Sequence, residues 1–158
     1  MKPKLIVYKV NSDEIAWVSP NDESMSFILS RVIPSGSNYL FVEELEDNPN
    51  YNDIFFSAYD FDWSLPNGTI ANVILDVEKA KTKFLFDLRA KREEVFSTLD
   101  VEFMKALETG NQTEIQRITT KKQQLRDATN IDFSNVTNVN DLISKWPTNL
   151  LGISPYNI

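Results

Sequence analysis

The chain has 158 residues, enough for one domain with a real hydrophobic core, or for one domain with a small appendage. It contains neither cysteine nor histidine, which excludes disulfides, thiolate or imidazole metal sites, and catalysis by a cysteine nucleophile or a histidine base. The formal net charge of −7 argues against nucleic-acid binding, which relies on a basic surface. We therefore expect no enzymatic activity, no cofactor, no metal and no nucleic-acid partner.

Residues 1–76 alternate short extended segments with turns. Segments rich in β-branched and aromatic residues predict strands at 5–10, 15–18, 39–42 and 69–75. Turn-forming residues at 11–13 predict that the first two strands form a hairpin. Ser24 or Ser26 is a suitable N-cap for a short helix that ends at Arg31. The acidic segment 43–52, interrupted by Pro49, predicts a surface loop.

From Asp76 onward the apolar pattern changes to a helical period. Asp76 is a good N-cap, and Gly110 is a good stop signal, so we expect one helix over 77–109. Its apolar stripe follows spacings of three, four and seven: Val77, Ala80, Phe84, Leu85, Leu88, Val95, Phe96 and Leu99. A second stripe predicts a helix over 112–128: Ile115, Ile118 and Leu125. The short connection predicts an antiparallel helical hairpin.

The last part of the chain, residues 130–158, is predicted to hold a short helix and a tail. Val139, Leu142, Ile143 and Trp146 share a helical face that Pro147 ends. The tail at 150–158 is apolar, so it is either docked on the protein or bound to a partner. The fold class is therefore α+β: a mixed, β-rich N-terminal domain (1–76), a helical hairpin (77–129), and a short helix with a tail (130–158).

The densest aromatic segment, residues 54–63, has two interpretations. It is either core at the junction between the two halves of the chain, which we favour, or a surface that binds a partner, since large aromatic side chains anchor interfaces. On the second interpretation the partner-binding residues are Phe55, Tyr59, Phe61 and Trp63.

Charged residues gather in a few places, and we favour a structural interpretation for each. Asp60 and Asp62, with Asp53, Glu46 and Asp47 nearby, could collect oxygens around Ca²⁺, but they lack the glycine and closing glutamate of an EF-hand loop. The lysines and arginines of 79–92 are interleaved with apolar and acidic residues, which indicates a solvated helix face with ion pairs. The neighbouring pairs Glu43/Glu44 and Glu93/Glu94 do not form a convergent acid pair of the glycosidase type.

No stretch approaches 18 consecutive apolar residues, so the sequence predicts no membrane-spanning helix. The first residues also lack the long apolar region of a signal peptide. We therefore expect a cytoplasmic protein without a membrane partner.

The order of several motifs in the second half resembles a known family. Arg89 and Arg92 form an Arg-x-x-Arg segment, a Leu-Asp follows at 99–100, a Leu-Arg-Asp at 125–127, and a Trp-Pro at 146–147. In the first half, the Val-Ile-Pro-Ser-Gly turn at 32–36 precedes a Tyr-Leu-Phe-Val strand and an acidic segment. This order resembles small tailed-phage proteins described as tail-fibre assembly or tail-assembly chaperone-like proteins. At 55–59 the chain has Phe-Phe-Ser-Ala-Tyr, where those proteins tend to have an Arg-x-Ala-Trp-like segment.

The resemblance implies a non-enzymatic protein that binds a phage tail-fibre or tail protein and assists its assembly in the host cytoplasm. The alternative is a permanent structural component of the virion tail, such as a baseplate, adaptor or fibre-tip subunit. The hairpin's leftover apolar surface allows self-association into a homo-oligomer.

Overall fold

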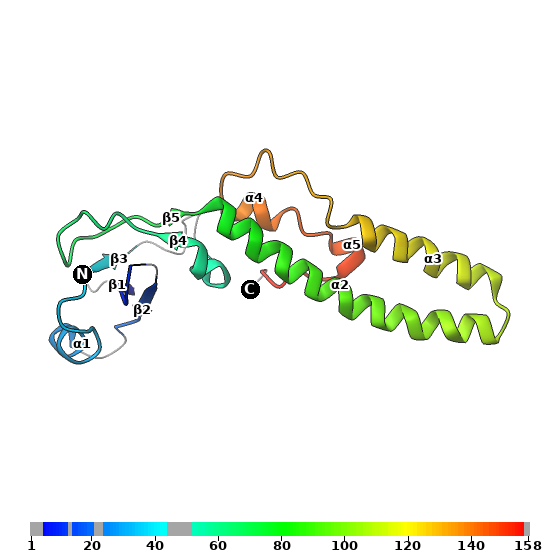
Figure 1. Ribbon diagram of the computed structural model, residues 1–158, viewed down its shortest axis with the longest axis horizontal. Helices are drawn as coiled ribbons and strands as arrows, with labels where there is room; N and C mark the ends of the chain where they lie inside the picture. The colour runs from blue at the N-terminus through cyan, green and yellow to red at the C-terminus, as the bar shows by residue number, and fades with distance from the viewer. Residues whose placement is uncertain (1–4, 13, 21–23, 44–51, 157–158) are drawn as a thin grey trace. The chain divides into compact units, whose positions relative to one another are not determined.

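The computed structural model describes residues 5–12, 14–20, 24–43 and 52–156. Their contacts form two compact units (Figure 1). Unit 1 comprises Met1–Tyr51 and Tyr59–Leu75, and unit 2 comprises Asn52–Ala58 and Asp76–Ile158. Unit 1 holds the strands and unit 2 the long helices, which confirms the α+β fold class.

Unit 1 is built on a three-stranded antiparallel sheet of order β2-β1-β3. Its strands are β1 (Leu5–Lys9), β2 (Ile15–Val18) and β3 (Tyr39–Val42). The predicted hairpin is confirmed, because Lys9 pairs with Ile15 and Ile6 with Val18. Asp13 of the predicted turn lies outside the described residues.

The helix α1 (Met25–Arg31) packs on one face of this sheet. Ser24 caps it by accepting a hydrogen bond from the backbone N–H of Phe27 at 3.3 Å, as the sequence predicts. Ile28 and Ile33 bury themselves against Ile6 of the central strand. Val7 and its cross-strand partner Leu40 point to the opposite face of the sheet from Ile6, and both are buried. Both faces of the sheet are therefore covered.

The predicted strand at 69–75 is wrong in its extent. Only β5 (Ile74–Leu75) is a strand, and it pairs with the equally short β4 (Tyr59–Asp60). The residues before it meet β3 at a single parallel bridge, in which Phe41 donates to the carbonyl of Thr69 and accepts from the N–H of Ala71. One such bridge satisfies a few backbone groups without forming a ladder.

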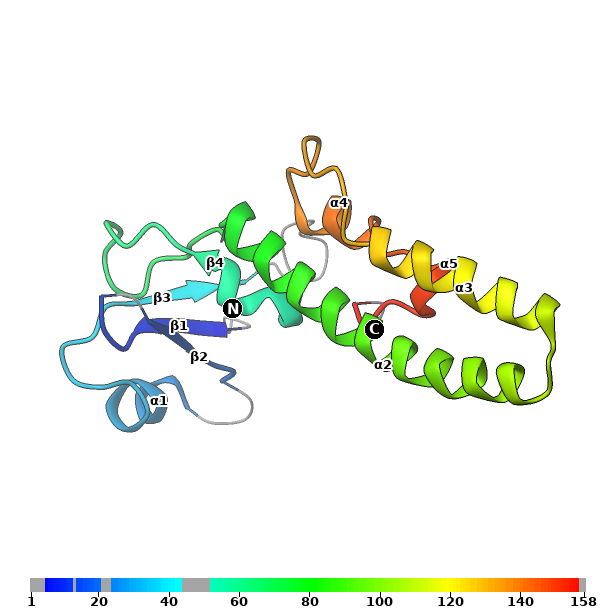
Figure 2. The same ribbon diagram turned by 45° about the vertical axis from the view of Figure 1, so that its right-hand side comes forward.

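Unit 2 is organised by the helical hairpin of α2 (Val77–Glu108) and α3 (Gln112–Asp127), which run antiparallel (Figures 1 and 2). Asp76 and Asn111 cap the two helices by accepting from the backbone N–H groups of Lys79 and Glu114. Gly110 joins them with a φ of 66°, a left-handed conformation that favours glycine. The predicted hairpin is confirmed, with its core residues fully or almost fully buried: Phe84, Leu88, Leu99, Ile118 and Leu125.

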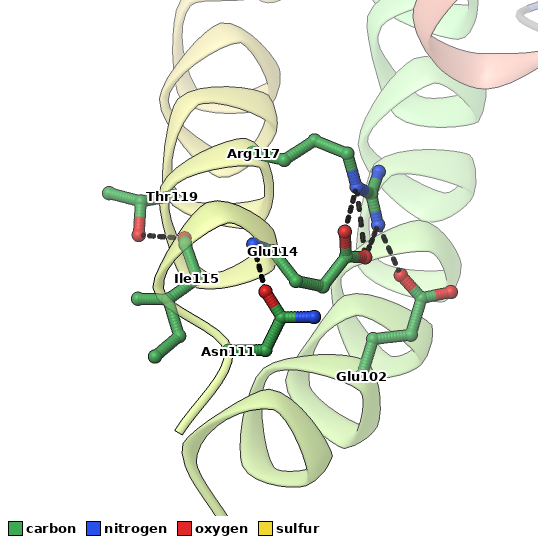
Figure 3. Close-up of polar contacts among 6 residues, drawn as sticks. All are labelled: Glu102, Asn111, Glu114, Ile115, Arg117 and Thr119. Atoms are coloured by element: carbon green, nitrogen blue, oxygen red, sulfur yellow. Dashed lines mark hydrogen bonds and ion pairs between the residues drawn. The ribbon is translucent and has the colours of Figure 1, made fainter. Parts of the chain in front are cut away.

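Polar contacts also join the two helices near the Gly110 turn. The Arg117 guanidinium contacts Glu114 of its own helix and Glu102 of α2, the latter at 3.0 Å (Figure 3). These hydrogen bonds raise the pKa of Arg117 and lower that of Glu114. Lys122, which lies in phase with the apolar stripe of α3, pairs with Asp100 at 2.6 Å and lies over the ring of Phe103. The side chains of Arg117 and Glu102 are about half exposed, so we expect this pair to orient the helices more than to stabilise them. The Lys122 side chain is only 15% exposed, whereas its partner Asp100 is 67% exposed.

The rest of unit 2 packs along the hairpin. It comprises η1 (Asp53–Ala58), α4 (Val139–Ile143) and α5 (Thr148–Leu151). Asn138 caps the predicted short helix α4, whose Val139 and Leu142 are buried. Leu151 and Tyr156 are also buried, so the described part of the tail is docked on the protein, which was one of its two predicted states.

Candidate interaction surfaces

The four predicted partner-binding residues fall in different units. Phe55 belongs to unit 2, where its ring lies 4.8 Å from that of Tyr156. Tyr59, Phe61 and Trp63 belong to unit 1. Phe55, Tyr59 and Phe61 are buried, and this burial fits the core interpretation of the segment.

Trp63 is the member of this set with a partly exposed side chain. Its indole N–H donates to Asp60 at 3.0 Å, and its ring contacts Phe61 edge-on and lies 5.3 Å from the ammonium of Lys9. These contacts fix the ring while leaving part of it accessible. Partner binding through these residues stays a prediction.

The acidic residues considered for Ca²⁺ have local hydrogen-bond partners. Asp60 accepts from Trp63 and from the backbone of Phe61, and hydrogen bonds from Ser64 lower the pKa of Asp62. Glu46 and Asp47 lie outside the described residues. In the part of the chain that the structure describes, no three acidic side chains are grouped so that they could hold a metal ion.

The basic run of 79–92 lies along α2 and is paired with acids of the same helix or its cap. Lys79 pairs with Asp76, Lys81 with Glu78, and Lys83 with Asp87. Further along, the two glutamates considered as an acid pair contact Arg92 and Lys91. These contacts agree with the interpretation of a solvated, ion-paired face.

An exposed apolar cluster that the sequence analysis missed lies near the end of α2. Its members are Val101, Met104 and Leu107, which are 55%, 56% and 47% exposed; we call it the tip patch. Val101 and Met104 lie on the opposite side of the helix from the buried Leu99 and Ala106. The sequence does contain a signal for this patch, because its three apolar residues do not follow the spacing of the buried stripe on the same helix.

A second apolar region of unit 2 surrounds two hollows along α2. One, of about 530 Å³, is lined by Ser57, Lys79 and Phe86, and the other, of about 470 Å³, by Ile54, Ala90 and Ile153. The two hollows share Lys83. Phe86 and Ile153 are 67% and 85% exposed, so large apolar side chains border a hollowed surface whose charges are already paired.

Comparisons with known proteins add no relative. No family model, no curated protein and no solved structure matches the chain. Among the described residues, no helix is long and apolar enough to cross a membrane. Exposed apolar side chains are the feature that these surfaces share, and such patches are typical of protein–protein interaction sites.

Proposed function

We propose that this chain is a non-enzymatic phage tail-associated protein that binds a tail-fibre or tail subunit and assists its assembly in the host cytoplasm. The phage setting rests on the order of motifs from Arg89 to Pro147. The binding role rests on the tip patch, since contiguous exposed apolar side chains usually mark an interaction site.

The position of the tip patch suits this role. It lies at the far end of a helix of 32 residues, which is about 48 Å long at 1.5 Å per residue. Large β-rich fibres expose strand edges and apolar surface while they fold, and these surfaces aggregate unless they are covered. A helical hairpin with an apolar end can cover such a surface during assembly and leave it afterwards.

The proposal is tested by co-expressing the chain with the tail-fibre or tail subunit encoded beside it and measuring capture of that subunit. The double variant Val101→Asp/Met104→Asp introduces charge into the tip patch without touching the buried side of α2. We expect capture to fall at least tenfold. The matched control is Ser97→Asp, an exposed position about one turn earlier on the same face, which should capture as the parent chain does.

Circular dichroism of each variant verifies that the helices persist. Undiminished capture by the folded double variant would refute the role of the tip patch. Failure of the parent chain to capture any neighbouring tail subunit would refute the proposed function itself. Purified particles then separate assembly factor from virion component, because only a permanent component remains in them at fixed stoichiometry.

A further inference from the structure

The ring of Tyr156 packs among three aromatic side chains of unit 2. The ring lies 4.8 Å from Phe55, 5.7 Å from Phe84 in a stacked arrangement, and 5.7 Å from Trp146 edge-on. Only 3% of Tyr156 is exposed. We call the three aromatic walls, together with Asp87 at the polar end, the Tyr156 socket.

The polar end of the socket recognises the phenol hydroxyl. The hydroxyl donates to Asp87 Oδ2 at 2.8 Å, and Asp87 Oδ1 accepts from the Lys83 ammonium at 2.7 Å. Burial, reinforced by the hydrogen bond to Asp87, raises the pKa of Tyr156 well above its usual value. The hydroxyl therefore stays protonated as a donor, and a phenylalanine in its place would lose this charge-assisted hydrogen bond.

The walls of the socket contact other residues besides Tyr156. Phe84 makes edge-on contacts with both Trp146 and Phe133, at 5.9 and 6.0 Å. The Trp146 indole N–H donates to the carbonyl of Gly152, which precedes the segment that enters the socket. The Phe84–Trp146 contact joins two of the three walls, so we expect these two walls to stay in place when the ring leaves.

The segment 153–156 has the features of a bound peptide. It has no helix or strand, and it follows Gly152, whose φ of 80° allows a sharp change of direction. Ile153 is almost fully exposed, whereas the backbone carbonyl of Tyr156 accepts from the side chain of Asn52 at 3.3 Å. Ser154 is also buried, and its hydroxyl accepts from the backbone N–H of Tyr156 at 3.3 Å. One buried aromatic ring, one buried serine and a few polar contacts thus fasten an irregular segment.

We propose that the Tyr156 socket is a recognition site for a tyrosine in an extended segment of a partner protein, and that residues 153–156 are its resident, displaceable occupant. The site would take such a ligand whether or not the partner is a tail protein. The hollow of about 470 Å³ beside the socket, with Ile54, Ala90 and Ile153 in its lining, offers a partner contacts beyond the tyrosine itself.

A partner protein fits this arrangement better than a second copy of the chain. The attached segment competes with an effective concentration in the millimolar range, as is typical of short tethers. A second copy would bring the same segment and gain only the same contacts. A partner that also fills the neighbouring hollow can exceed them.

The test uses the complete chain carrying Tyr156→Ala, which empties the socket. Its probe is a fluorescein-labelled peptide with the sequence of residues 150–156, capped at its C-terminus, and binding is followed by anisotropy. We expect the variant to bind this peptide at least tenfold more tightly than the parent chain does. A peptide with phenylalanine in place of the tyrosine should bind several-fold more weakly. The matched control is Ile153→Ala, which changes an exposed residue of the same segment and should behave as the parent chain.

Absence of binding by the folded Tyr156→Ala chain would overturn the proposal, as would equal affinity for the two peptides or equal binding by the parent chain. Hydrogen exchange on the parent chain decides the matter if the variant does not fold. A displaceable occupant opens locally, so the amides of Ile153, Ser154 and Tyr156 should exchange at least tenfold faster than those around Leu88. Exchange of both sets at the same slow rate would make the segment integral core and overturn the proposal.

Discussion

Leu88 shows how a single side chain holds the long helix in place. It lies one turn after Phe84 on α2, and both are completely buried. The exposed neighbour Arg89 lies on the same turn and faces solvent. Stability at this point of the helix therefore depends on the face that a side chain occupies.

We expect Leu88→Ala to lower the free energy of unfolding by about 2–5 kcal/mol, because it removes apolar contacts and leaves a cavity. Leu88→Asp should cost more, since it places an unpaired carboxylate in the same apolar site. Urea unfolding followed by circular dichroism measures both. The control Arg89→Ala should change stability by no more than about 0.5 kcal/mol, and an equally small effect of Leu88→Ala would contradict the burial of Leu88.

Asp76 couples the start of α2 to pH. The backbone N–H of Lys79 donates to its carboxylate, and this hydrogen bond lowers the pKa of Asp76 below its usual value of 3.8. A carboxyl whose pKa is lower in the folded state stabilises the protein above the unfolded-state pKa. That contribution is lost as pH falls from about 4 through the folded-state pKa.

The variant Asp76→Asn isolates this contribution, because asparagine caps a helix as well as aspartate but does not titrate over this range. Between pH 5 and pH 3 the melting temperature of the variant should fall less than that of the parent chain. Thermal melts at a series of pH values measure the difference. Parallel curves for the two proteins would show that the cap does not depend on the charge of Asp76.

At the scale of elements, the hairpin could be predicted because its signals are local and repeated. The α2 stripe, the caps at Asp76 and Asn111, and the stop at Gly110 all indicate the same two helices. The η1 turn carries no such repeat, since consecutive aromatics such as Phe55 and Phe56 fit several structures. Its conformation follows from packing between segments distant in sequence, as the contact of Phe55 with Tyr156 shows.

The candidate surfaces were harder to predict than the helices. An apolar residue on a helix is expected to be core, and only its phase relative to the buried stripe distinguishes Met104 from Leu99. The sequence likewise left two alternatives for the apolar tail that contains Tyr156, docking on the protein or binding to a partner. Assigning Met104 to the surface requires knowing which side of α2 is covered. Assigning Tyr156 to the core requires knowing which residues the tail packs against.

At Gly110, which joins α2 to α3, the backbone conformation determines which residues are tolerated. Its φ of 66° disfavours residues with a Cβ, although an added Cβ there would meet no atom within 4 Å. We therefore expect Gly110→Ala to cost about 1–2 kcal/mol through the backbone alone. Gly110→Asn should cost less, because asparagine tolerates this conformation. Urea unfolding of the two variants compares them, and equal losses would point to an effect other than the left-handed backbone.

At the scale of the whole molecule, the chain enters unit 2 before it has finished unit 1. Residues 52–58 pack in unit 2, whereas residues 59–75 return to unit 1. The change from a strand-like to a helical apolar pattern near residue 76 does not reveal that residues 52–58 pack in unit 2. The pattern indicates which secondary structure a segment forms, but not which other segments it packs against. The aromatic segment is thus shared: Phe55 serves one core and Phe61 the other.

This division predicts different consequences for two similar substitutions. Phe55→Ala and Phe61→Ala each remove a buried phenylalanine and should each cost about 3–5 kcal/mol in the unit concerned. Hydrogen exchange measured by mass spectrometry should show faster exchange in α2 and α4 for Phe55→Ala, and in β1 and β3 for Phe61→Ala. Each variant serves as the control for the other, since the residue type and its burial are matched. If either substitution accelerated exchange equally in both units, the two cores would unfold as one, and the assignment of Phe55 and Phe61 to separate units would be wrong in energetic terms.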